Sequence, residues 1–248
     1  MTKSARIRIG IGGWTYERWR GTFFPDGLAQ KRELEYASRK LTTIEINGTY
    51  YGSQKPESFA KWREETPDDF VFAVKGPRFA TNRRQLAEAG DSIERFFKSG
   101  VTELKDKLGP INWQFMGTKK FDPEDFGAFL TLLPREKDGI ALRHAVEVRH
   151  ASFACQQFYD LARKHNVAIV YAKDEDFPEI DEATSSFTYA RLMATEENLK
   201  SGVSEAALNG FAKQAKAWAK RGDVFAYFIS GAKVRNPAAA QALIKKLG

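Results

Sequence analysis

The sequence has 248 residues, of which 42% are hydrophobic and 29% are charged, and its formal net charge is +7 at neutral pH. A chain of this size with 13% aromatic residues can bury a sizeable core, which excludes disordered and collagen-like proteins. A single cysteine, Cys155, excludes a disulfide scaffold. No run of about 18 apolar residues and no apolar leader segment is present, so we expect a cytoplasmic protein that does not contact membranes.

Eight β-rich runs alternate with helical patterns along the whole chain. In chain order the strand candidates are residues 6–11, 43–47, 70–75, 111–115, 145–149, 167–172, 187–192 and 224–229. Several helical patterns have a proline in the first turn, as at Pro56, Pro123 and Pro237. Eight alternating units in about 250 residues favour a single-domain α/β fold of the TIM-type (β/α)8 barrel over residues 1–248, with irregular or missing helices allowed. An open doubly wound sheet is the alternative.

Side chains alternate between the two faces of a strand, and in five of these strands the polar ones share a face. Val, Ile and Leu usually fill a barrel interior, so inward-facing Glu45, Glu147, Arg149 and Arg191 near the carboxyl ends of strands need partners. We expect a polar pocket at that end of the barrel. The alternative is an internal ion-pair lattice without chemistry.

Three residues are the catalytic candidates. Glu45 and Glu147 could form a general acid and base pair, and Arg149 should lower the pKa of Glu147 and favour its role as a base. Lys75, at the end of an apolar strand, is a candidate Schiff-base nucleophile. Its alternative role is an ion pair with Glu45 on the adjacent strand, and we favour this pair, which would raise the pKa of Lys75 and keep it protonated.

Cations gather near the predicted strand ends, at Lys75, Arg149 and Arg191 and in the loop 230–235 that leads to a helix. Arginine and the loops after the last barrel strands commonly bind phosphate or carboxylate, so a small anionic ligand is expected. Aromatic side chains beyond the first two strands could stack on this ligand or plug the barrel. The candidate substrate-binding residues are Trp14, Tyr16, Asn47, Tyr50, Gln114, Arg149, His150, Arg191 and Tyr227.

Metal ligands are sparse in the sequence. Of the three histidines, His144 begins a strand and His165 ends a helix, so only His150 lies near the expected mouth. The acidic run 173–176, with Glu179 and Asp181 beyond it, matches a solvated loop better than a magnesium site. We predict neither a metal nor another cofactor.

The positive charge is concentrated in the C-terminal part of the chain, where residues 198–248 hold nine Lys or Arg and two acidic residues. Lys213, Lys216 and Lys220 share one amphipathic segment, so a solvated helix surface is favoured over a nucleic-acid interface.

A set of motifs then extends almost from end to end. It comprises Gly13-Trp14, Tyr16, Trp19, Phe24-Pro25, Glu45-Ile46-Asn47, Thr49-Tyr50-Tyr51, Val74-Lys75, Leu108-Gly109-Pro110, Val146-Glu147-Val148-Arg149-His150 and Tyr189-Ala190-Arg191-Leu192. The sequence thus resembles the family grouped as domain of unknown function 72, also called YecE-like. The resemblance implies a TIM-barrel-like fold with a polar pocket, in a family without an established activity.

The chain departs from the family pattern at two positions where histidine is usual, Asn82 and Met193. If those histidines are catalytic in relatives, this chain has lost the activity or changed its substrate. The sequence therefore predicts a barrel enzyme for a small anionic substrate, phosphorylated, carboxylated or sugar-like, with reaction and oligomeric state left open. The alternative is a noncatalytic protein that binds a small ligand, or nucleic acid through its basic C-terminal third.

Overall fold

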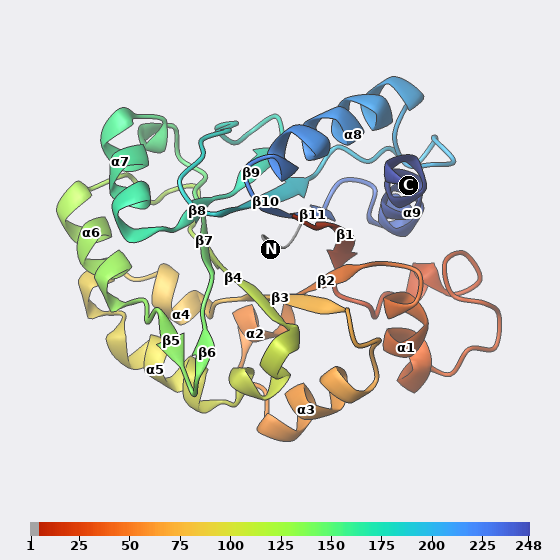
Figure 1. The fold of residues 1–248 in the computed structure, drawn as a ribbon, viewed down its shortest axis with the longest axis horizontal. Coiled ribbons are helices and arrows are strands. Elements are labelled where there is room, and N and C mark those ends of the chain that lie inside the picture. The colour runs from red at the N-terminus through yellow and green to blue at the C-terminus, as the bar shows by residue number, and fades with distance from the viewer. Residues whose placement is uncertain (1–4) are drawn as a thin grey trace.

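The computed structural model describes residues 5–248, and a parallel sheet occupies its centre (Figure 1). The strands are β1 (Ile7–Gly12), β2 (Thr43–Ile46), β3 (Val71–Lys75), β4 (Leu108–Gln114), β7 (His144–Glu147), β8 (Ala168–Ile169), β9 (Tyr171–Lys173), β10 (Phe187–Leu192) and β11 (Asp223–Phe228). Their order across the sheet is β8-β7-β4-β3-β2-β1-β11-β10-β9. Every strand that sequence periodicity predicted is present, within three residues at each end.

The two outermost strands of this order, β8 and β9, are consecutive in the chain and are separated only by Val170. The Val170 N–H donates to the carbonyl of Val146 at 3.0 Å, while β9 pairs with β10. The sheet is therefore nearly closed into a barrel, and the predicted strand 167–172 is divided into two short strands by this residue. The predicted barrel-type fold is confirmed, and the alternative of an open doubly wound sheet was wrong.

Helices surround the outside of the sheet (Figure 1). They are α1 (Glu33–Ser38), α2 (Gly48–Tyr51), α3 (Pro56–Glu64), α4 (Arg78–Thr81), α5 (Gly90–Lys98), α6 (Pro123–Leu132), α7 (Gln156–His165), α8 (Glu205–Ala219) and α9 (Asn236–Leu247), and a small hairpin of β5 (Glu136–Lys137) and β6 (Ile140–Ala141) follows α6. Proline lies in the first turn of α3, α6 and α9, as the sequence predicted. Asp122 also caps α6 by accepting from the N–H groups of Glu124 and Asp125.

No helix connects β9 to β10 in the described chain, and residues 174–186 form a loop in its place. This segment is acidic and lacks the apolar periodicity of a helix. Side chains attach it to neighbouring helices: Asp181 accepts from Trp218 Nε1 on α8 at 2.8 Å, and Glu182 pairs with Arg163 on α7. The loop is thus held from outside and passes over one side of the barrel.

The alternation along the strands divides the apolar residues into two cores. Residues on one face, including Ile44, Val74 and Trp113, pack between the sheet and the helices. The opposite face forms a second cluster inside the barrel, of Val71, Ala73, Ala145, Ala168, Val170, Phe187, Tyr189, Phe225 and Tyr227. The polar side chains share the parity of this inner cluster, so they project into the barrel nearer the carboxyl ends of the strands.

Candidate functional site

The inward-facing polar side chains meet in one group, which we call the interior cluster. It consists of Glu45 on β2, Lys75 on β3, Asn112 and Gln114 on β4, Glu147 on β7 with Arg149 beyond it, and Tyr189 and Arg191 on β10. The strand register places Gln114 beside Glu147 and Lys75 beside Asn112. The fold thereby brings together polar side chains from five parts of the sequence, four of which contribute ionisable groups.

Glu147 is completely buried and lies between two arginines. Arg191 Nη1 donates to both carboxylate oxygens, at 2.7 and 2.8 Å, and Arg149 donates to Oε1 through Nε at 3.0 Å and Nη2 at 2.6 Å. Burial alone would raise the pKa of Glu147, but attraction to Arg191 and Arg149 outweighs it and lowers the pKa to about 2. Glu147 is therefore a carboxylate at neutral pH, as the nearby Arg149 led us to expect.

Glu45 is also fully buried and receives donors from three sides. Tyr189 Oη donates to Oε2 at 2.5 Å, Arg191 Nη2 lies 3.3 Å from Oε1, and Asn112 Nδ2 lies 3.5 Å from Oε2. Asn112 Nδ2 also donates to Glu147 Oε2 at 3.1 Å. Both carboxylates thus contact the same amide nitrogen, so their Oε2 atoms are separated by at most the sum of these two distances. This separation is below the upper limit of roughly 9.5 Å for the paired carboxylates of glycoside hydrolysis.

The surroundings of Lys75 differ from the sequence prediction. Within residues 5–248 no ion pair joins it to Glu45; its Nζ donates to Gln114 Oε1 and lies 4.4 Å from the centre of the Tyr50 ring. The pKa of Lys75 is lowered to about 8, chiefly because the ammonium is buried and secondly because Arg191 repels it. The predicted ion pair and raised pKa were therefore wrong, and the chemical argument against a nucleophilic lysine no longer applies.

The interior cluster contains more cationic side chains than carboxylates. Three cations, Lys75, Arg149 and Arg191, face two carboxylates. Two buried polar atoms, Arg191 Nε and Asn112 Oδ1, have no hydrogen-bond partner. Since a buried donor without a partner is costly, an anionic or carbonyl oxygen at Arg191 Nε would satisfy a group that the chain leaves open.

Apolar side chains cover the cluster on the side of β9, β10 and β11. Ala172, Met193 and Ile229, at the ends of these strands, form a small buried group with the half-buried Phe177 from the 174–186 loop. The Phe177 ring also lies 4.5 Å from the guanidinium carbon of Arg149. Met193, one of the two positions where the family resemblance led us to expect histidine, is thus part of a small apolar group.

Several predicted ligand-binding residues lie apart from the cluster. Trp14 packs edge-on against Trp62 of α3, and Tyr16 packs against Trp19 beneath the Lys233 ammonium. Tyr227 is in the barrel interior, where its hydroxyl pairs with Thr43 at 2.9 Å instead of reaching the carboxylates.

Two other predicted residues make local contacts near the strand ends. Asn47 Nδ2 lies 3.4 Å from the backbone carbonyl of Glu45. The Nδ1 atom of His150 accepts from the Ser152 N–H at 3.1 Å and caps the following turn. Tyr50, by contrast, contacts the cluster through Lys75.

The remaining metal candidates have separate partners. His144 is buried at the start of β7 and pairs with Trp113 and the Pro134 carbonyl, and burial lowers its pKa to about 4. Glu179 pairs with Lys173 and with the hydroxyl of Tyr171. Among the described residues, no group of three or more His, Cys, Asp or Glu side chains is arranged around a common point.

Two members of the interior cluster, Asn112 and Tyr189, were not among the predicted site residues. Both have the same inward parity as the residues that were, and this was the signal that could have identified them. In the structure each of them contacts Glu45, which their strand positions alone did not indicate.

The family model described as "Protein of unknown function DUF72" matches residues 8–248. The chain belongs to the DUF72 family. The "UPF0759 protein YecE" of Escherichia coli (strain K12) is 31% identical over 150 residues, covering 59% of this chain and 50% of that protein, so the match spans about half of the relative's length. The resemblance inferred from the sequence motifs is confirmed.

Solved structures show the same fold. A DUF72 family protein from Thermotoga maritima superimposes with a TM-score of 0.78 at 22% identity, covering 98% of both chains. A xylose isomerase-like TIM barrel/4-hydroxyphenylpyruvate dioxygenase fusion protein matches with a TM-score of 0.57 at 16% identity, over 98% of this chain and 44% of that one. These similarities establish a TIM-barrel-like fold for this DUF72 member.

Across residues 5–248, no helix combines the length and the apolar character that a membrane span requires.

Proposed function

We propose that this DUF72 protein is a cytosolic enzyme for a small anionic carbonyl compound, with Lys75 as its amine nucleophile. The observation that carries the proposal is the setting of Lys75: its Nζ is buried against Gln114 and the Tyr50 ring, with no carboxylate within 4 Å in the described residues, whereas carboxylates hold the other cations of the cluster. The lowered pKa of Lys75, about 8, supports it. At pH 7 roughly a tenth of such an amine is unprotonated, against about one part in three thousand at the ordinary pKa of 10.5.

The chemistry proceeds through an imine. The lone pair of Lys75 Nζ attacks the carbonyl carbon, a C–N bond forms, and the carbonyl oxygen takes up a proton. Loss of one water from this carbinolamine gives a protonated imine, so no oxidant or reductant is consumed. The positive charge of the imine withdraws electrons from the adjacent carbon, which is the purpose of such an intermediate.

The rest of the cluster serves binding and positioning. Arg149 is the half-buried cation at its edge and is suited to the substrate's phosphate or carboxylate, and Arg191 Nε offers a second donor. Glu147 and Glu45 hold these cations. With a pKa of about 2, Glu147 is a weak general base, so the acid–base pair is a weaker candidate mechanism than the lysine.

Reductive trapping tests the proposal. We expect sodium borohydride to fix pyruvate or glyceraldehyde 3-phosphate to Lys75, with half-maximal labelling near pH 8, as read by peptide mass spectrometry. Lys75→Met should abolish this label, and Lys173→Arg, at a half-exposed lysine, should not change it.

Labelling that is spread over surface lysines, or that survives in Lys75→Met, would overturn the lysine mechanism. Binding of these anions without any trapped adduct would instead support the noncatalytic alternative.

A further inference from the structure

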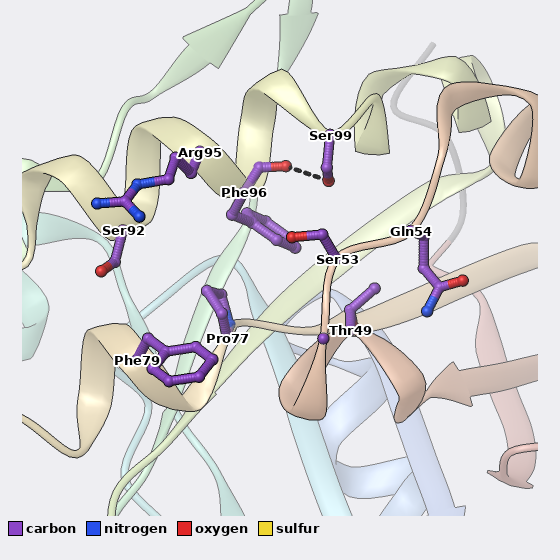
Figure 2. A pocket seen from close by; sticks show the side chains of 10 residues that line it. Thr49, Ser53, Gln54, Pro77, Phe79, Ser92, Arg95, Phe96 and Ser99 are labelled. Carbon is purple, nitrogen blue, oxygen red and sulfur yellow. Dashed lines mark hydrogen bonds between the residues drawn. The ribbon is translucent and has the colours of Figure 1, made fainter.

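A hollow lies outside the barrel, on the side of β3 where the interior cluster holds Lys75. It is a cavity of about 180 Å³ between α2, residues 52–54, α4 and α5, and we call it the rim pocket. Figure 2 shows Phe96 and Arg95 reaching it from α5, with Pro77 and Phe79 on the side of α4 and Thr49 on the side of α2. Thr49 Oγ1 donates to the backbone carbonyl of Lys75 at 2.7 Å, which fixes this wall to β3.

Three arginine side chains without carboxylate partners among the described residues lie in this pocket or in the hollow next to it. Arg95 lines the rim pocket, and an adjoining hollow of about 440 Å³ shares Phe79, Ser92 and Arg95 and adds Arg78 and Arg83. Within the described chain, no carboxylate lies within 4 Å of any of the three arginines. Arg83 is held in place by hydrogen bonds to Ser92 Oγ and the Phe79 carbonyl. Three unneutralised guanidinium groups in this arrangement suit a phosphate.

Aromatic rings lie beside these cations. Phe79 is 61% exposed and Tyr51 is 64% exposed, which is unusual for side chains of this size. The Arg78 guanidinium carbon lies 5.6 Å from the centre of the Phe79 ring and 5.8 Å from that of Tyr51. The exposed faces of these rings are available for stacking on a flat ring, as aromatic side chains do on bases in nucleic-acid complexes.

The polar groups of the rim pocket suit the edges of such a ring. Thr49 and Ser99 both donate to backbone carbonyls, which leaves their oxygens free to accept. Gln54 contributes an amide, and among the described residues its side chain has no hydrogen-bond partner. Hydroxyl and amide groups of this kind recognise ring nitrogens and ribose hydroxyls.

We propose that the rim pocket binds a nucleotide, with the base against Phe79 and the phosphate at Arg95, Arg83 and Arg78. The site is separate from the interior cluster and does not depend on the chemistry of Lys75. A phosphate attached to an aromatic base occurs both in free nucleotides and in nucleic-acid strands. The small volume of the rim pocket, about 180 Å³, suits a single base better than a run of stacked bases and favours the free nucleotide.

Isothermal titration calorimetry with AMP on the full chain tests this assignment. We expect AMP to bind more tightly than either adenosine or inorganic phosphate. Phe79→Ala should weaken AMP binding at least about fivefold and Arg95→Ala about tenfold, because they remove the stacking surface and a charge-assisted contact. Both residues are exposed, and circular dichroism verifies that the variants remain folded.

Two controls define the site. Lys216→Ala removes one exposed cation from α8 and should leave AMP binding unchanged, as should Lys75→Met. An affinity for AMP that is undetectable, or that is equal in Phe79→Ala, Arg95→Ala and the unmodified chain, would overturn the proposal. A short oligoadenylate that binds through Phe79 and Arg95 at least tenfold more tightly than AMP would also overturn it, in favour of a nucleic-acid strand.

Discussion

Arginine occupies two contrasting settings near the carboxyl ends of the strands. Arg191, with only 4% of its side chain exposed, pairs with both Glu147 and Glu45 inside the barrel. Arg95, on the outer side of α5, is exposed and has no carboxylate within 4 Å in residues 5–248. The difference follows from solvation, because a buried charge requires a counter-ion from the protein whereas an exposed one is stabilised by water. The exposed Arg95 has no counter-ion from the protein within the described residues, so a ligand could supply all of it.

The largest effect should come from removing the buried cation. Arg191→Met leaves two buried carboxylates with fewer partners, and we expect a loss of about 3–5 kcal/mol in the free energy of unfolding, measured by urea denaturation at pH 7. Arg191→Lys keeps the positive charge but not the planar guanidinium with its fixed N–H donors. It should lower the free energy of unfolding less than Arg191→Met does.

The matched control is Arg32→Met, at an exposed arginine paired with Glu35. This variant should unfold at nearly the same urea concentration as the unmodified chain. Equal destabilisation by Arg191→Met and Arg32→Met would show that the interior pairs contribute no more than surface ones.

An intermediate effect is expected from pH through Lys75. Its pKa is lowered from 10.5 to about 8, so between these values the unfolded chain binds a proton that the folded chain has released. Stability should consequently rise with pH over this interval, by up to about 3 kcal/mol at full separation of the two pKa values.

The measurement is urea denaturation at intervals from pH 7 to pH 10.5 for the unmodified chain and for Lys75→Met. The difference between the two free energies should increase with pH from about 8 to 10.5, the interval between the two pKa values. A difference that is independent of pH would mean that Lys75 titrates normally in the folded protein.

The smallest effect should come from the exposed arginine. Arg95→Ala removes no buried partner, and we expect the free energy of unfolding to change by less than about 0.5 kcal/mol. If thermal unfolding instead shows a loss comparable to that of Arg191→Met, the contrast between the two settings fails.

Strand parity made the fold and much of the interior cluster predictable. Glu45, Glu147 and Arg191 each sit on a face that the alternation of their strand defines, and parallel strands then bring those faces together. The helices opened by Pro56, Pro123 and Pro237 were predictable for a local reason, because proline fits the first turn.

The partner of Lys75 was not predictable from parity alone. In the sheet Glu45 lies beside Ala73, whereas Lys75 is two residues further along β3 and lies beside Asn112. The Lys75 ammonium therefore lies nearer the carboxyl ends of the strands than the Glu45 carboxylate does, and it contacts Gln114. How far along the barrel axis a side chain lies depends on the stagger between neighbouring strands, which the sequence pattern of one strand does not specify.

Residues beyond the strand ends could not be placed either. Trp14 follows β1 without a repeating pattern to orient it, and it packs outward against α3. The rim pocket combines Thr49, Pro77 and Arg95 from three connections whose mutual approach exists only in the folded chain.

The loop between β9 and β10 and the strands of the barrel contribute different side chains to the region of the interior cluster. Apart from Arg149, the charged side chains of the interior cluster belong to strands, and their positions are tied to the hydrogen-bonded framework of the barrel. Phe177, which lies over Arg149, belongs to a helix-free stretch that only side chains secure. Reactivity and access are thus encoded in separate pieces of sequence, so the covering loop can vary in size or composition while the reactive groups keep their geometry.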